Sequence, residues 1–169
     1  MPKISQTPAP LWAPWRMEYV KHWQESSACF LCEYLKDKKP KEPVIAISKH
    51  SYVVLNIYPY NPGHIMIVPK KHKGCLEDLE REEFYDLSDL TRSSIRIIRE
   101  TLNPEGLNLG LNLGKAAGAG VMDHLHYHMI PRWLGDTNFM PLISETKVIS
   151  EHLSSTYKTL REAFAKGGF

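Results

Sequence analysis

The sequence predicts an α+β domain built on an antiparallel sheet of about five strands. Five short apolar runs have the character of strands, and two longer segments have the 3.6-residue apolar period of amphipathic helices. The helices stand between and after groups of strands, which differs from the regular β-α-β alternation of a parallel sheet. A chain of 169 residues has the usual length of one domain, so we expect residues 1–169 to form a single domain.

The N-terminal segment is expected to be an extended arm. Residues 1–14 hold four prolines and few periodic apolar positions. Three β-type runs follow at 44–47, 52–55 and 64–68, and Pro and Asn residues between 56 and 63 form a turn before the third. Short strands with short connections favour an antiparallel meander.

A long amphipathic helix is expected after the third strand. Apolar residues from Phe84 to Leu102 fall on one broad helical stripe. The sequence Asn-Pro-Glu-Gly at 103–106 ends this helix, and two more strands are expected, at 107–113 and 125–130. A glycine-rich loop separates these two strands, and a C-terminal helix is expected over about 148–165.

Composition excludes several classes of protein. Hydrophobic residues make up 43% and charged residues 24% of the chain, as in ordinary globular domains. The 21 basic and 19 acidic residues give a net charge of +2, too balanced for a protein that coats nucleic acid. No apolar run reaches the ~20 residues of a membrane span, and the N-terminus lacks the apolar core of a signal peptide. We therefore expect a cytoplasmic protein that binds neither nucleic acid nor membrane.

Three histidines alternate with apolar residues at the fifth expected strand. His124, His126 and His128 stand two residues apart, so that on a strand their imidazoles project from one face, about 6 to 7 Å apart. A strand with a packing role alone does not need three polar rings on one face, and the pattern therefore predicts a chemical function for the histidines. The spacing permits either catalysis by the rings themselves or a catalytic zinc ion held by all three.

The cysteines favour metal binding. An odd number of three is poor material for a disulfide framework, whereas Cys29 and Cys32 have the C-x-x-C spacing of metal ligands. No second C-x-x-C is present, so the pair by itself is half of a metal site.

The run His-Leu-His-Tyr-His at 124–128 resembles the signature of the histidine triad superfamily, and Pro-Gly-His at 62–64 resembles an upstream motif of the same superfamily. Further segments are similar to its bacterial diadenosine tetraphosphate phosphorylase branch, namely 11–17, 58–64, 109–114 and 131–139. The resemblance covers most of the chain. It implies the histidine triad fold, a homodimer, and transfer of a nucleotidyl group from a dinucleoside polyphosphate.

The resemblance also implies roles for individual residues. The middle histidine, His126, would attack an α-phosphorus, while His128 and His64 would flank the phosphates as hydrogen-bond or proton donors. Contacts to ribose and phosphate would come from Asn56, Asn112, Gly118, Ala119 and Gly120. In zinc-bearing relatives two histidines complete the C-x-x-C pair, and their positions match His72 and His124. A closed structural zinc site would then consist of Cys29, Cys32, His72 and His124.

The favoured function is cleavage of diadenosine tetraphosphate with inorganic phosphate, which gives ADP and ATP. Relatives often carry Gln or Ser in the glycine loop where this chain has Ala119 and Gly120, and a side-chain donor near the reacting phosphate is thereby absent. One alternative is a hydrolase that uses water to cleave dinucleoside polyphosphates or nucleoside phosphoramidates. An alternative of another class is a nucleotide-binding protein without turnover. The arm and the C-terminal segment are expected to supply the dimer interface.

Overall fold

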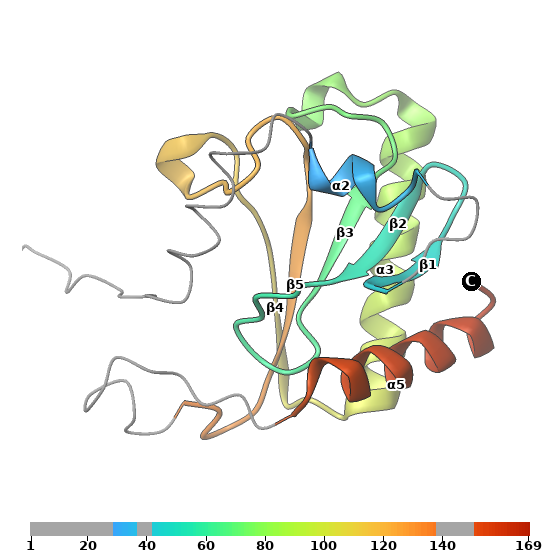
Figure 1. Cartoon of the computed structure of the whole chain (residues 1–169), viewed down its shortest axis with the longest axis vertical. Helices are drawn as coiled ribbons and strands as arrows, with labels where there is room; N and C mark the ends of the chain where they lie inside the picture. The colour runs from blue at the N-terminus through green and yellow to red at the C-terminus, as the bar shows by residue number, and fades with distance from the viewer. Residues whose placement is uncertain (1–28, 37–41, 138–150) are drawn as a thin grey trace, which may run out of the picture.

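A computed structural model describes residues 29–36, 42–137 and 151–169 of the chain (Figure 1). Within these ranges one antiparallel sheet has the strand order β1-β2-β3-β5-β4. The strands are β1 (Val44–Ile47), β2 (Ser51–Leu55), β3 (Ile65–Pro69), β4 (Gly106–Leu111) and β5 (Tyr127–Arg132). The helices are α2 (Phe30–Glu33), α3 (Arg81–Leu102) and α5 (Leu153–Lys166), with 3-10 turns at Leu76–Asp78 and Lys115–Ala117. The predicted α+β class is confirmed.

The predicted elements agree with the observed ones except near their ends. The first three strands form the expected meander, with β2 paired to both β1 and β3. The fifth strand begins at Tyr127, two positions later than expected, because the N–H of Leu125 donates to the carbonyl of Lys73 (2.7 Å) outside the ladder. The C-terminal helix begins at Leu153 in the described residues. The expected arm over 1–14 and the helix start at 148–150 lie outside them.

The first three strands are apolar on both faces and almost entirely buried. Helices α3 and α5 cover one face (Figure 1), and their residues Leu87, Ile98 and Phe164 belong to the main core. A smaller cluster on the other face packs Leu31 of α2 against β2 and β3. The hydroxyl of the fully buried Tyr52 donates to the carbonyl of Leu31 (2.7 Å), which fixes α2 on the sheet.

Strand β5 lies between β3 and β4 and separates the core from the candidate site. Met129 is fully buried in the main core, and Tyr127 packs against that core from the same side of the strand. His128 alternates with them and stands opposite Met66 of β3 and Gly110 of β4. Directly opposed residues of antiparallel strands share a face, so His128 projects from the face that α3 does not cover.

Helix α3 places a buried acid at its start and a tight turn at its end. The carboxylate of Glu83 accepts the backbone N–H of Glu80 at 3.0 Å and so closes the first turn. At the other end Asn103 adopts the left-handed conformation (φ 45°), a common way for a helix to end. None of the described helices has the length and apolar character needed to cross a membrane.

Gly63 is a position that the fold restricts to glycine. Its φ of +75° lies in the left-handed region, and an added Cβ would overlap Cδ1 of Leu102 and lie 3.1 Å from Cγ of Pro131. The turn before β3 therefore passes close beneath the end of α3, and this close approach sets where His64 enters the sheet. The positive φ and the close contacts thus explain why the Pro-Gly-His motif has glycine at its second position.

The change Gly63→Ala should lower the free energy of unfolding by about 3 kcal/mol, because left-handed strain and overpacking add. For a chain of this length that corresponds to a fall of roughly 6–12 °C in the melting temperature, measurable by calorimetry. Gly110→Ala is the control: no described atom lies within 4 Å of the added Cβ, and the melting temperature should stay within about 2 °C. Equal losses in both variants would contradict the steric explanation.

Candidate active site and metal centre

His126 is a buried histidine whose ring proton has a fixed position. The side chain is 5% exposed and lies just before β5. Its Nδ1 lies 2.8 Å from the carbonyl oxygen of His124, and because a carbonyl only accepts, Nδ1 carries the proton and Nε2 keeps its lone pair. Burial lowers the pKa of His126 and outweighs the opposing effect of that hydrogen bond. The ring is therefore neutral at pH 7, the state in which an imidazole nitrogen is a nucleophile.

His64 and His128 form a directed pair beside His126. The backbone N–H of Tyr60 donates to Nδ1 of His64 (3.1 Å), so the proton of the neutral His64 ring lies on Nε2. That Nε2 lies 3.0 Å from Nδ1 of His128 and donates to it, which places the His128 proton on its own Nε2. The rings of His126 and His128 meet edge to face, with centroids 4.9 Å apart. Three of the predicted site histidines are thus in one cluster.

The asparagine expected before the third strand belongs to the same cluster. The amide nitrogen of Asn56 lies 3.3 Å from Nδ1 and 3.4 Å from Nε2 of His64. Its side-chain oxygen accepts the N–H of Tyr58 at 2.9 Å, so the amide is held in one orientation by its own turn. The Asn56 side-chain amide and the His64 ring therefore lie close together just before β3.

The glycine-rich loop forms a turn that uses some of its own donors. The N–H groups of Gly118 and Ala119 donate to the carbonyls of Lys115 (3.0 Å) and Gly114 (3.3 Å). The amide of Asn112 donates to the carbonyl of Gly118 at 3.4 Å. For Gly118 and Ala119 to bind phosphate as the resemblance implies, the loop would have to exchange these internal hydrogen bonds for bonds to the anion. The remaining expected residue, Gly120, is half-buried.

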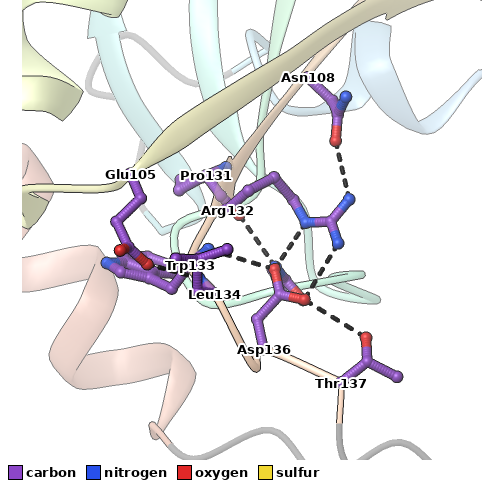
Figure 2. A network of polar contacts seen from close by, with 9 residues as sticks. Glu105, Asn108, Pro131, Arg132, Trp133, Leu134, Asp136 and Thr137 are labelled. Atoms are coloured by element: carbon purple, nitrogen blue, oxygen red, sulfur yellow. Dashed lines mark hydrogen bonds and ion pairs between the residues drawn. The ribbon is translucent and has the colours of Figure 1, made fainter.

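A polar network that the sequence did not predict fixes the turn before His64 (Figure 2). The side-chain amide of the fully buried Asn61 donates to the carbonyl of Pro131 (2.9 Å) and to the carboxylate of Asp136. The backbone carbonyl of Asn61 accepts the N–H of His64 (3.1 Å). Arg132 holds Asp136 through two nitrogens, one of them 3.0 Å from Oδ1. The Arg132 guanidinium keeps the pKa of Asp136 well below its usual range. Asn61 and Asp136 are thus positioning residues for His64.

The four residues implied as metal ligands meet at one point. Cys29 and Cys32 come from the start of α2, His72 from the segment after β3, and His124 from the segment before β5. One ligand atom of each lies within 4.8 Å of all the others. Nδ1 of His124 lies 3.3 Å and 3.4 Å from the two sulfurs, and Nδ1 of His72 lies 3.3 Å from Cys32 Sγ. These N–S distances are close to the value of about 3.6 Å between N and S ligands of tetrahedral zinc with its usual bond lengths.

The chemistry of these donors fits a cation. Nε2 of His124 donates to the carbonyl of Pro69 (2.8 Å), which leaves the Nδ1 lone pair directed at the sulfurs. Burial lowers the pKa of His124 and keeps the ring neutral. Burial and the neighbouring Cys29 raise the pKa of Cys32 to about 11, so its thiolate needs a nearby positive charge. The cluster is able to hold a metal ion, and His124 is directed into it, away from a three-histidine catalytic site.

Comparisons with known proteins give relatives at the level of both sequence and fold. The family model described as HIT domain matches residues 37–133. The chain is 41% identical to an AP-4-A phosphorylase of Mycobacterium tuberculosis over 92% of this chain and 84% of that protein. It is 32% identical to an asymmetrical bis(5'-nucleosyl)-tetraphosphatase of Schizosaccharomyces pombe over 70% of this chain and 65% of that protein. A Zn-bound histidine triad family protein from Mycobacterium smegmatis superposes with a TM-score of 0.65 at 26% identity, over 82% of this chain and 94% of that one.

Replacing Asp136 by Asn should lower the free energy of unfolding by about 1 kcal/mol at pH 7, because Arg132 is partly exposed and solvent screens the ion pair. Arg132 lowers the folded-state pKa of Asp136. The contribution is therefore fully present above the unfolded pKa of about 3.9 and is lost as pH falls from there toward the folded pKa. Melting temperatures of both proteins should differ by a constant amount from pH 7 to about pH 4, and the difference should shrink as the pH is lowered further, to about pH 2.

The control for this prediction is Asp89→Asn, which removes the ion pair with Arg92 on the exposed face of α3. That variant should melt within about 1 °C of the wild type at every pH. A gap between Asp136→Asn and wild type that widens toward pH 3 would show that the sign of the Asp136 contribution is wrong.

Proposed function

Since the chain belongs to the HIT domain family, we propose that it cleaves diadenosine tetraphosphate with inorganic phosphate through a nucleotidyl group carried on His126. The observation that carries this proposal is the state of His126, a neutral buried ring with its lone pair on Nε2 beside the His64–His128 pair. The 41% identity to an AP-4-A phosphorylase over most of both chains supports the choice of substrate and acceptor.

In the first step Nε2 of His126 forms a bond to one α-phosphorus, and the bond from that phosphorus to the bridging oxygen breaks. The leaving group is ATP, and an adenylyl group stays on the ring. The substituted ring is a cation whose Nδ1–H becomes more acidic, and the His124 carbonyl, already 2.8 Å away, stabilises it. In the second step an oxygen of inorganic phosphate attacks the same phosphorus, releases ADP and restores His126.

His128 and His64 supply the proton for the leaving group in this proposal. The hydrogen bonds from Tyr60 to His64 and from His64 to His128 place a proton on Nε2 of His128. His128 can donate this proton to the oxygen that leaves with ATP or hydrogen-bond a non-bridging oxygen. Asn56, Asn112 and the loop residues 118–120 are proposed to contact ribose and phosphate.

We also propose that Cys29, Cys32, His72 and His124 hold a structural zinc ion. A donor set of two thiols and two imidazoles gives a closed tetrahedral site with no position for substrate. The ion would supply the positive charge that the Cys32 thiolate needs and would join α2 to the segments after β3 and before β5. The Zn-bound histidine triad protein with a similar fold supports zinc as the metal.

A homodimer acting in the cytoplasm is part of the same proposal, with residues 1–169 as one domain. Strand β4 is one of the two outer strands of the described sheet, and its Leu109 side chain is 47% exposed. An outer strand with unpaired backbone groups and an exposed leucine suits pairing with a second copy. Of the interface expected from the arm and the C-terminal segment, the arm lies outside the described residues and the C-terminal segment is described from residue 151.

The reaction is tested by identifying the products from diadenosine tetraphosphate in phosphate-free buffer and in millimolar phosphate. We expect ADP and ATP, formed only with phosphate. AMP and ATP at the same rate in both buffers would instead indicate the hydrolase, as the tetraphosphatase relative suggests. No conversion under either condition, with nucleotide still bound, would indicate the nucleotide-binding alternative.

His126→Ala should lower kcat by roughly 10³-fold or more while largely sparing nucleotide affinity, because the group acts in the transition state. The matched control is His152→Ala, which removes an exposed histidine at the start of α5 and should keep wild-type turnover. Full activity of His126→Ala would refute the covalent mechanism for phosphorolysis and hydrolysis alike.

Metal analysis of the purified protein should find about one zinc per chain. Cys32→Ala should lose the zinc and several degrees of melting temperature, whereas Cys75→Ala, which changes the exposed third cysteine, should keep both. His126→Ala should also keep its zinc, which separates this site from a three-histidine cage. Zinc retained after both Cys29 and Cys32 are replaced would contradict the assignment.

A further inference from the structure

A buried carboxylate is paired with the segment that carries His72, one of the candidate metal ligands. Glu83, in the first turn of α3, has a side chain that is 4% exposed. Its Oε1 lies 2.6 Å from Nζ of Lys71, and its Oε2 lies 3.2 Å from Nζ of Lys73. These two lysines flank His72 in the chain. The carboxylate therefore holds the residue on each side of a candidate metal ligand.

The side chains of this segment alternate in direction. Lys71 and Lys73 both reach Glu83, whereas Nδ1 of His72 between them faces Cys32 Sγ at 3.3 Å. The two ion pairs on either side of His72 therefore limit the directions that its side chain can take. His72 itself is largely exposed, so its own packing does little to orient it. The two ion pairs restrict its backbone together with two backbone hydrogen bonds, from the N–H of Lys70 to the carbonyl of His50 (2.8 Å) and from the N–H of Leu125 to the carbonyl of Lys73 (2.7 Å).

The same segment also positions the ligand on the far side of the centre. The carbonyl of Lys73 accepts the N–H of Leu125 at 2.7 Å. Leu125 is buried and lies between His124, a candidate ligand, and His126, the proposed nucleophile. A displacement of Lys73 is thereby transmitted to the backbone that carries both histidines.

Stability alone is a weak reason for a buried acid at this position. Removing the Glu83 carboxylate from water costs free energy that its attraction to the two lysines only partly returns, and apolar replacements of buried ion pairs are often as stable. Burial raises the pKa of Glu83, but hydrogen bonds from Lys71, the Glu80 N–H and Lys73 outweigh it and bring the pKa to about 2. The group is thus a permanent anion with all its partners in place, suited to fixing geometry.

We propose that Glu83 is a positioning residue for the metal centre, which it serves by holding Lys71 and Lys73 on either side of His72. The inference rests on the zinc site proposed above and assigns to that site a residue that contacts none of its ligands. Outer residues that orient metal ligands typically contribute 10- to 100-fold to metal affinity. Glu83→Gln keeps the size of the side chain and removes its charge, so it tests this role directly.

The experiment measures the zinc dissociation constant of the full chain by competition with a chromophoric chelator, together with melting temperatures with and without zinc. Glu83→Gln should weaken zinc binding about 10- to 100-fold. The matched control is Asp86→Asn, one turn further along α3. Asp86 accepts the backbone N–H of His50 (3.1 Å) and the Ser48 hydroxyl, so its loss destabilises the turn between β1 and β2 and leaves both ion pairs of Glu83 in place. Asp86→Asn should therefore lower the melting temperature and leave the zinc affinity unchanged.

A second pair of variants keeps the test informative if Glu83→Gln folds poorly. Lys73→Ala should weaken zinc binding several-fold, whereas Lys70→Ala, which removes an exposed lysine bonded to the Lys49 carbonyl, should not. Unchanged zinc affinity in Glu83→Gln would overturn the inference, and Lys73→Ala takes its place if Glu83→Gln does not fold. An equal loss of zinc affinity in Asp86→Asn would also overturn it. If the wild-type protein binds no zinc, both this inference and the proposed zinc site are wrong. The outcomes measured on the variants concern this inference alone and do not contradict the zinc site.

Discussion

The hydrogen bond from the N–H of Leu125 to the carbonyl of Lys73 is the contact on which both histidine clusters depend. It holds residues 124–126 against the segment that follows β3 before the ladder of β5 begins at Tyr127. With Leu125 buried in the core, the histidines on either side are turned away from the core. His124 then reaches the cysteines of α2, while His126 lies beside His128. One backbone contact thus separates the candidate metal centre from the proposed nucleophile two residues away.

Backbone groups determine where the protons of three of these rings lie, and the His64 side chain then sets that of His128. The carbonyl of Pro69 takes the proton of His124, the carbonyl of His124 takes that of His126, and the N–H of Tyr60 occupies Nδ1 of His64. Because these atoms belong to the folded chain itself, each tautomer is fixed once the fold forms. A catalytic group prepared in this way needs no reorganisation before it reacts.

Local sequence patterns predicted the strands and helices, but they did not predict the contacts between segments that are far apart in the chain. The run 44–47 is bounded by turn residues and was predicted with the limits that β1 has. The residues implied as metal ligands came from resemblance, since spacing alone shows only that Cys29 and Cys32 can act together. The bond from Asn61 to Asp136 spans 75 positions, and neither residue stands in a periodic pattern that indicates its partner. Such polar contacts are set by tertiary structure, which a one-dimensional pattern does not contain.

The separation of the metal ligands along the chain has a consequence for the order of folding. Cys32 stands 40 positions before His72 and 92 positions before His124. Closing such long loops costs entropy, which the pairing of β3 with β5 and the apolar core must first offset. During synthesis the cysteines leave the ribosome well before the last ligand exists. The complete centre can therefore form only late, and a chain interrupted before residue 124 carries exposed thiols without the ligand that completes their site.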